Sequence, residues 1–155
     1  AVRKEKLEAV GGFPLGVKSG EDIIMWARLA CAGDLAYSGY ATASYVAPPI
    51  SVAANKAALR HPQTPDYVGN ALEELRISCE LYAASLTLFA ADWHRIRAML
   101  FLEFNERSAC LFELRRAVTL SRLSLKDVVC CGLLTLPMFL RTRTLAFIRR
   151  NRRRQ

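Results

Sequence analysis

The sequence predicts a short α/β segment followed by an all-helical region, so that the chain as a whole is mostly helical. At 35–38 and 43–47, apolar residues alternate with small or polar ones, which is the pattern of a half-buried strand. Beyond residue 70, apolar residues recur in steps of three and four, which is the spacing of one helix face. We place the boundary between the two segments at residue 69, giving ranges 1–69 and 70–155.

Length allows one full domain or two partial ones, and composition allows a globular core. The chain has 155 residues, and 52% of them are hydrophobic, too many for a disordered chain. It begins with Ala rather than Met and shows no signal-peptide pattern. We therefore expect the natural protein to extend upstream.

Two helices separated by a glycine turn open the chain. Residues 3–10 are helix formers, and Gly11 and Gly12 end that helix because glycine adopts positive φ without a steric penalty. A second helix begins at Glu21 and ends at Gly33-Asp34. Its predicted apolar face contains Ile23, Trp26, Ala27 and Ala30.

Two short strands and an irregular connector complete the first segment. The strands at 35–38 and 43–47 are stopped by Pro48 and Pro49. Two strands are too few for a stable sheet, so we expect this segment to need partner strands that the chain does not supply.

The second segment reads as a series of helices. One apolar stripe predicts a long first helix, made by Leu72, Leu75, Cys79, Tyr82, Leu86 and Phe89. Asp92 is a candidate N-cap for a second helix that runs to Phe104, with Trp93, Ile96 and Leu100 facing inward.

Two further helices follow. Residues 106–120 continue the helical pattern, either as a separate helix or joined to the preceding one. Ser124 with Asp127 resembles a capping box that begins the last helix. Pro137 is expected to stop or kink that helix.

Glu21 and Asp22 are the first candidates for chemistry. Acidic residues in the first turn of a helix stabilise it through the helix dipole, and capping is one interpretation of this pair. The other is that one carboxylate acts as a general base, which requires it to lie exposed within hydrogen-bond reach of a substrate hydroxyl.

The residues around this pair resemble family 2 glycosyltransferases, enzymes of the GT-A (Rossmann-like) fold that use nucleotide-sugar donors. The resemblance covers residues 8–47, about a quarter of the chain. It rests on Glu8-x-x-Gly11-Gly12-Phe13, on Gly20-Glu21-Asp22-x-x-x-Trp26-x-Arg28-Leu29-Ala30, and on the strand that begins at Leu35.

The resemblance implies a role for each motif residue. Asp22 matches the catalytic base that takes the acceptor hydroxyl proton in an inverting transfer, and Glu21 matches its acidic neighbour. Gly11 and Gly12 match the loop that lets the backbone approach the substrate. Trp26 either lines the acceptor pocket or packs the helix on the sheet, and Arg28 either binds substrate or makes a surface or structural contact.

The donor half of such a site is missing from these residues. The family's Asp-x-Asp motif, which binds a divalent cation (Mg or Mn), lies upstream of the acidic motif, and no Asp-x-Asp occurs here. We therefore interpret the chain as the C-terminal portion of an enzyme. The nucleotide-sugar donor and a saccharide or lipid-linked acceptor would be partners of the full enzyme, and the chain alone would transfer no sugar.

Cysteine and histidine suggest no metal site. The five cysteines lack CxxC spacing and lie in apolar helical patterns, which favours buried thiols in a reducing compartment over disulfides or zinc. His61 and His94 are expected in a solvated loop and on a helix surface.

The C-terminal tail is strongly basic. Residues 141–155 contain seven arginines and no acid, whereas the other 140 residues carry 15 basic and 14 acidic groups. The tail is either a solvated end or a segment attracted to an anionic membrane, since apolar residues lie among its arginines. Nucleic acid is disfavoured, because no stacking platform or known motif accompanies the charge.

These observations leave two functions open. The first is a glycosyltransferase of the cytoplasm, in peripheral contact with the inner face of the membrane. The alternative is a non-catalytic helical interaction module with a basic membrane-surface tail, in which Glu21 and Asp22 only cap a helix.

Overall fold

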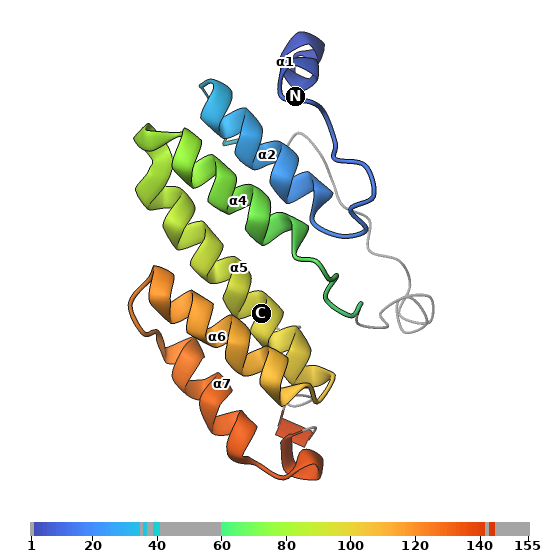
Figure 1. Cartoon of the computed structure of the whole chain (residues 1–155), viewed down its shortest axis with the longest axis vertical. Helices are drawn as coiled ribbons and strands as arrows, with labels where there is room; N and C mark the ends of the chain where they lie inside the picture. The colour runs from blue at the N-terminus through green and yellow to red at the C-terminus, as the bar shows by residue number, and fades with distance from the viewer. Residues whose placement is uncertain (1, 35, 37–38, 41–59, 142, 145–155) are drawn as a thin grey trace.

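Helices are the only regular elements in the part of the chain that the computed structural model describes, residues 2–34, 36, 39–40, 60–141 and 143–144 (Figure 1). In chain order they are α1 (Lys4–Ala9), α2 (Glu21–Ala32), α4 (Tyr67–Ser78), the 3-10 helix η1 (Glu80–Tyr82), α5 (Ala83–Glu103), α6 (Arg107–Leu120) and α7 (Leu125–Thr135).

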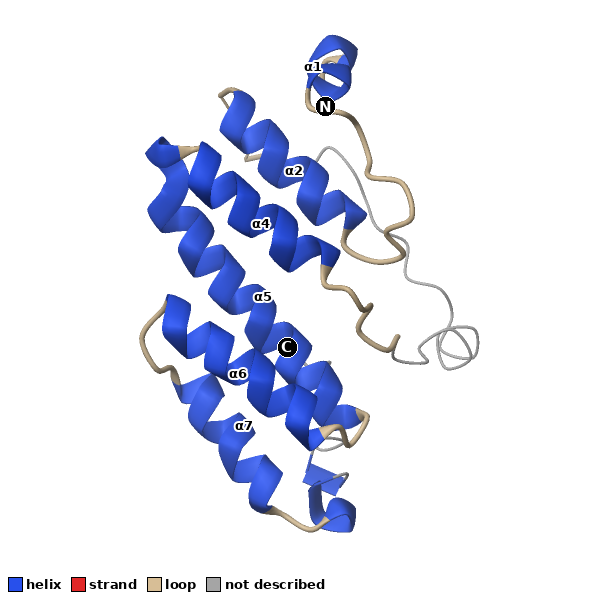
Figure 2. Cartoon of the chain, viewed as in Figure 1, coloured by secondary structure: helices blue, strands red, loops and turns tan. Residues whose placement is uncertain are grey.

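The predicted α/β architecture is wrong, because no residue in the described ranges forms a strand (Figure 2). The predicted strand at 43–47 lies outside those ranges, as does 35–38 apart from Ala36, which is not in a strand. The apolar side of α2 packs on other helices instead of a sheet: Ile24 and Ala27 belong to one core cluster with Leu72 of α4 and Leu86 of α5. A helix that buries its apolar side in this way needs no sheet.

The long helix α5 connects two hydrophobic cores. Its first half packs with α2 and α4, and its second half packs with α6 and α7 (Figure 1). The second core is formed by Ala98, Phe101, Leu102, Cys110, Leu114, Cys130, Leu133 and Leu134. Residues from 24 to 134 therefore contribute to two cores that share one helix.

The predicted long helix over residues 72–89 is interrupted at Cys79. The backbone of Cys79 leaves the helical region (φ −118, ψ 75), η1 follows, and α5 begins at Ala83. Asp92 consequently lies inside α5 and caps nothing, so the predicted helix start there is wrong. Neither Gly nor Pro marks the break, which explains why periodicity ran through it.

The other predicted helices are confirmed. α1 and α2 match the expected helices over 3–10 and from Glu21 to Gly33, and α6 matches 106–120. Ser124 and Asp127 form the expected capping box, and α7 ends at Thr135, two residues before Pro137. Every helix among the described residues is either too short or too polar to span a lipid bilayer.

An ion pair connects α5 to the start of α7. Arg95 Nε donates to Asp127 Oδ1 over 2.9 Å, and Arg95 Nη2 donates to Asp127 Oδ2 over 3.0 Å. Asp127 is buried, and burial alone would raise its pKa. Hydrogen bonds from Arg95 and Ser124 outweigh burial and lower that pKa, so the folded protein holds the aspartate in its ionised form at neutral pH.

Candidate functional site

The loop before α2 is shaped by Gly20, the helix N-cap. Its φ is +86, and a Cβ added there would lie 2.6 Å from Val68 Cγ2 of α4. Both the left-handed backbone and the close approach to α4 therefore require glycine. This contact seats the first turn of α2, which carries Glu21 and Asp22, directly against α4.

Asp22 and Trp26 lie together on the solvent-facing strip of α2. They are one turn apart, which places them on one side of the helix, and both are exposed. The Trp26 side chain keeps 49% of its surface accessible, so it is not among the residues that pack α2 on the core. The buried side is formed instead by Ile24, Met25, Ala27 and Leu29.

Glu21 and Arg28 lie on a neighbouring part of α2, and Arg28 faces the glycine turn that follows α1. A Cβ at Gly11 would be 3.8 Å from Arg28 Nη1, so the guanidinium lies beside the turn between α1 and α2. Gly11 and Gly12 both have positive φ, as the predicted turn requires. Glu21 is half-buried in the first turn. The motif residues thus form an open strip, Asp22 with Trp26, and a turn contact, Gly11 with Arg28.

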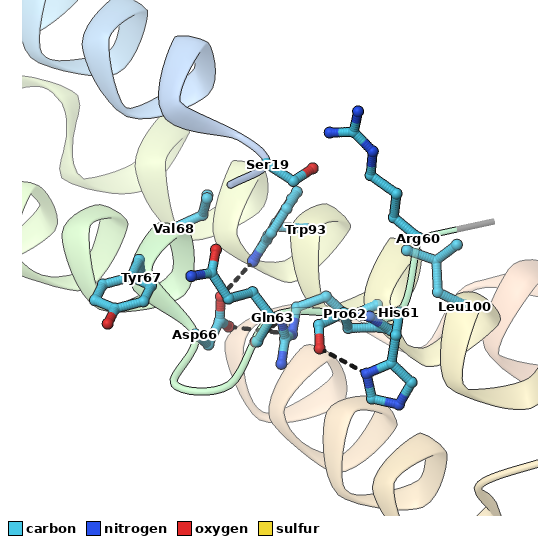
Figure 3. Close-up of a pocket in the computed structure, with 11 residues that line it drawn as sticks. Ser19, Arg60, His61, Pro62, Gln63, Asp66, Tyr67, Val68, Trp93 and Leu100 are labelled. Carbon is cyan, nitrogen blue, oxygen red and sulfur yellow. Dashed lines mark hydrogen bonds and ion pairs between the residues drawn. The ribbon is translucent and has the colours of Figure 1, made fainter. Parts of the chain in front are cut away.

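A small pocket lies close to the entry of α2. Its walls come from segment 60–63, the first residues of α4, and one side of α5 (Figure 3). Ser19 lines the pocket from the loop just before Gly20. The sequence did not predict this pocket, because its walls are brought together from three separate parts of the chain.

Gln63 holds the pocket segment to the loop before α2. Its Oε1 accepts from Lys18 N over 2.9 Å, and its Nε2 donates to Gly16 O over 3.2 Å. Arg60 Nη1 also donates to Lys18 O over 3.2 Å. These bonds fix the approach to α2 relative to α4 and α5.

His61 lies at the edge of the pocket and pairs with Glu106. Its Nε2 is 2.6 Å from Glu106 Oε1, and its ring contacts Phe101 and Phe104. The hydrogen bond to Glu106 raises the pKa of His61. The ring is about half exposed, so the predicted solvated position is only partly confirmed.

A buried ionic cluster of Asp66, His94, Arg97 and Glu113 lies behind the pocket. His94 Nδ1 is 2.7 Å from Glu113 Oε2, and Arg97 Nε donates to Glu113 Oε1 over 2.8 Å. Arg97 Nε is also 3.3 Å from Asp66 Oδ2. Burial disfavours the charge on Glu113, but the hydrogen bonds from His94 and Arg97 prevail and lower its pKa.

Asp66 connects this cluster to the start of α4. Its Oδ1 accepts from Gly69 N over 3.0 Å, which caps α4, and from Trp93 Nε1 over 3.0 Å (Figure 3). Arg97 Nη1 donates to Gln63 O over 3.1 Å. One set of polar contacts therefore extends from the loop before α2 to α6.

The prediction that His94 lies on a helix surface is wrong, since the side chain is 1% exposed. A signal was present in the sequence: His94 and Arg97 share the α5 face of Ala90 and Phe101, at spacings that fit one side of a helix. Their polar side chains suggested a solvent-facing position, because their partner Glu113 is distant in the sequence, 19 residues after His94 and 16 after Arg97.

Asp66, His94 and Glu113 are the described residues that could hold a metal ion, since their ligand atoms lie within 4.8 Å of one another. Arg97 already contacts both carboxylates, which gives them a cation inside the protein. The two carboxylates, the guanidinium and the imidazole are arranged as an ion-pair cluster, and a further dication would face the charge of Arg97 at short range.

The cysteines and the first residue of the basic tail differ in how far they are buried. All five cysteines are free, and Cys110 and Cys130 are buried as predicted, whereas Cys131 is exposed. Arg141, the first residue of the predicted basic tail, is 2% exposed and donates from Nη2 to Asn105 Oδ1. The basic tail therefore begins after a residue that belongs to the folded part.

The chain matches no protein-family model, no curated protein and no solved structure in three separate comparisons.

Proposed function

We propose that the chain supplies the acceptor side of a glycosyltransferase site, with Asp22 as the general base for an inverting transfer. Glu21 is its acidic neighbour, Trp26 borders the acceptor, and Gly11, Gly12 and Arg28 shape the adjoining turn. The proposal rests on the motif and on its placement, and it does not require the α/β architecture that the described residues lack.

The observation that carries this proposal is the exposed strip formed by Asp22 and Trp26. A general base must reach a substrate hydroxyl directly or through one water, and Asp22 is exposed rather than used to pack α2. One turn away, the exposed indole of Trp26 offers a flat apolar face of the kind that a sugar ring can cover. An exposed aromatic residue beside an exposed carboxylate is better placed to bind a sugar acceptor than to pack in a hydrophobic core.

A nucleotide-sugar donor and its divalent cation (Mg or Mn) would be bound by groups other than those identified here, because the sequence contains no Asp-x-Asp. In this arrangement Asp22 accepts the proton of the acceptor hydroxyl as the oxygen attacks the anomeric carbon, and the nucleoside diphosphate leaves from the opposite face. The chain by itself is accordingly inactive.

The alternative is a non-catalytic helical interaction module, in which Asp22 serves the helix alone. Asp22 Oδ1 accepts from Ile23 N over 2.8 Å, a local contact that a capping residue also makes. The all-helical character of the described residues favours this alternative.

The decisive test is Asp22→Asn in the full-length natural protein, assayed by release of nucleoside diphosphate from a panel of nucleotide sugars. We expect transfer to fall by about 10²–10⁴-fold, the usual contribution of a general base, while the KM for the donor is unchanged. Glu74→Gln, which alters an exposed carboxylate on α4, is the matched control and should leave transfer unchanged.

Two results would contradict the proposal. Full transfer by the Asp22→Asn protein would exclude Asp22 as the base. Micromolar binding of a nucleoside diphosphate by the chain alone, measured by calorimetry, would show that the donor site is within these residues.

A further inference from the structure

An apolar strip runs along the outer side of α7, which lies at one edge of the helical array (Figure 1). Leu125, Val128 and Val129 are exposed, and Leu125 keeps 79% of its surface accessible. Their spacing of three and four places them on one side of the helix. The side that includes Cys130 and Leu134 is buried against the core of α5 and α6.

Within residues 107–144 every exposed charge is positive, and the exposed acid Asp92 of α5 is paired with Arg95. Residues 107–144 contain two acids, Glu113 and Asp127, and both are buried in ion pairs with arginines of α5. The exposed cations of the same stretch are Arg107, Arg115, Arg122, Lys126 and Arg143. Residues 145–155 add five arginines and no acid to the sequence.

We propose that the strip of α7, together with the cations of α6 and α7, binds the surface of an anionic lipid bilayer. An amphipathic helix with basic flanks lies in the plane of the interface, its apolar side among the acyl chains and its cations near the headgroups. The proposal rests on the surface of α7 and is independent of any activity at Asp22.

The positive charge and the apolar side chains of this surface together favour an anionic bilayer over other partners. A second copy of the chain would bring one cationic surface against another, which is repulsive. Nucleic acid would satisfy the cations but would leave Leu125, Val128 and Val129 without apolar partners. An anionic bilayer satisfies both properties of the surface.

The test is co-sedimentation of the purified chain with phosphatidylcholine vesicles, with and without about one-third phosphatidylglycerol. We expect binding to the anionic vesicles and at least about tenfold weaker binding to the neutral ones. Raising the salt from about 0.1 M to about 0.5 M should weaken binding, because the Debye length shortens.

Leu125→Glu and Leu81→Glu form a matched pair of variants. Leu81 in η1 is 82% exposed, similar to Leu125, but it lies far from α7 along the chain. Leu125→Glu should weaken binding about tenfold or more, since it adds an anion to the apolar strip, while Leu81→Glu should bind like wild type. Circular dichroism and urea unfolding verify that both variants fold.

A third form, ending after Thr144, separates the strip from the terminal arginines. This form should retain vesicle binding at reduced affinity. Equal binding by the two Leu→Glu variants, no preference for anionic vesicles, or complete loss of binding on truncation would overturn the proposal.

Two other results would assign the surface to a different partner. If light scattering shows a dimer that is lost in Leu125→Glu, and vesicles are not bound, the surface serves self-association. DNA binding that is unchanged by Leu125→Glu, together with no vesicle binding, would show that the surface binds nucleic acid instead.

Discussion

Replacing Glu113 with Gln should destabilise the fold strongly and make its stability less dependent on pH. Glu113 is buried and accepts from two donors, His94 Nδ1 at 2.7 Å and Arg97 Nε at 2.8 Å. A neutral amide has one oxygen and no charge, so it can accept from only one of these groups and cannot balance the charge of Arg97. Arg97 then has a single nearby carboxylate, that of Asp66 at 3.3 Å.

The expected loss follows from this geometry. Removing one partner of a buried ion pair costs about 3–5 kcal/mol, because the remaining charge stays buried without compensation. Asp66 still offsets part of the charge of Arg97, so we expect the lower end, about 3 kcal/mol. Natural domains have unfolding free energies of about 5–15 kcal/mol, so the variant should fold but unfold at much lower urea concentration.

The pH dependence has a defined sign. The pKa of Glu113 is lowered in the folded protein from its ordinary value of 4.5. Its stabilising contribution is therefore fully present above about pH 4.5 and is lost as the pH falls through the lowered folded-state pKa. Glu113→Gln lacks this titration, so the difference in unfolding free energy between wild type and variant should shrink in acid.

Urea unfolding followed by circular dichroism, repeated from about pH 7 to about pH 3, measures both effects. Glu74→Gln on the exposed side of α4 serves as the control and should change stability by less than about 0.5 kcal/mol. A loss below about 1 kcal/mol at neutral pH would refute the buried cluster as described. A difference that stays constant into acid would refute the titration of Glu113.

The remaining predictions concern the helices around this cluster. Arg95→Met leaves the buried carboxylate of Asp127 without its guanidinium. The free energy of unfolding, measured with urea, should fall by about 3–5 kcal/mol. A fall below about 1 kcal/mol would contradict the ion pair between α5 and α7. The Cβ added by Gly69→Ala would clash with Asp66 Oδ2, so the cap of α4 must move. We expect the free energy of unfolding to fall by about 1–3 kcal/mol. The Cβ added by Gly132→Ala in α7 has no atom within 4 Å, so this variant should raise the free energy of unfolding by about 0.5–1 kcal/mol. The two alanine variants should therefore shift the thermal unfolding midpoint in opposite directions, and a shift in the same direction would contradict the described backbone.

Local signals in the sequence were sufficient for much of the helical structure. The start of α2 after Gly20, the capping box of Ser124 and Asp127, and the end of α7 before Pro137 all depend on residues within a few positions of each other. Capping, backbone freedom and periodicity act over that range, so each could be recognised from the residues alone.

The same signals failed where partners come from elsewhere in the chain. The apolar stripe continued through Cys79, but α4 ends there and α5 begins separately. Trp26 fits the apolar side of α2 by type, yet the packing of Ile24 and Ala27 on α4 turns it to the solvent.

The residues of the candidate site also fall into those that the sequence could indicate and those that only the packing decided. Residue types and spacing were enough to single out Asp22 and Trp26, but the exposure of Trp26 became evident only once α2 was packed against α4. His94 is the opposite case: an imidazole is stable in the interior only with a hydrogen-bonding partner. Glu113 provides that partner from a different helix, a pairing that only the folded chain brings within 2.7 Å.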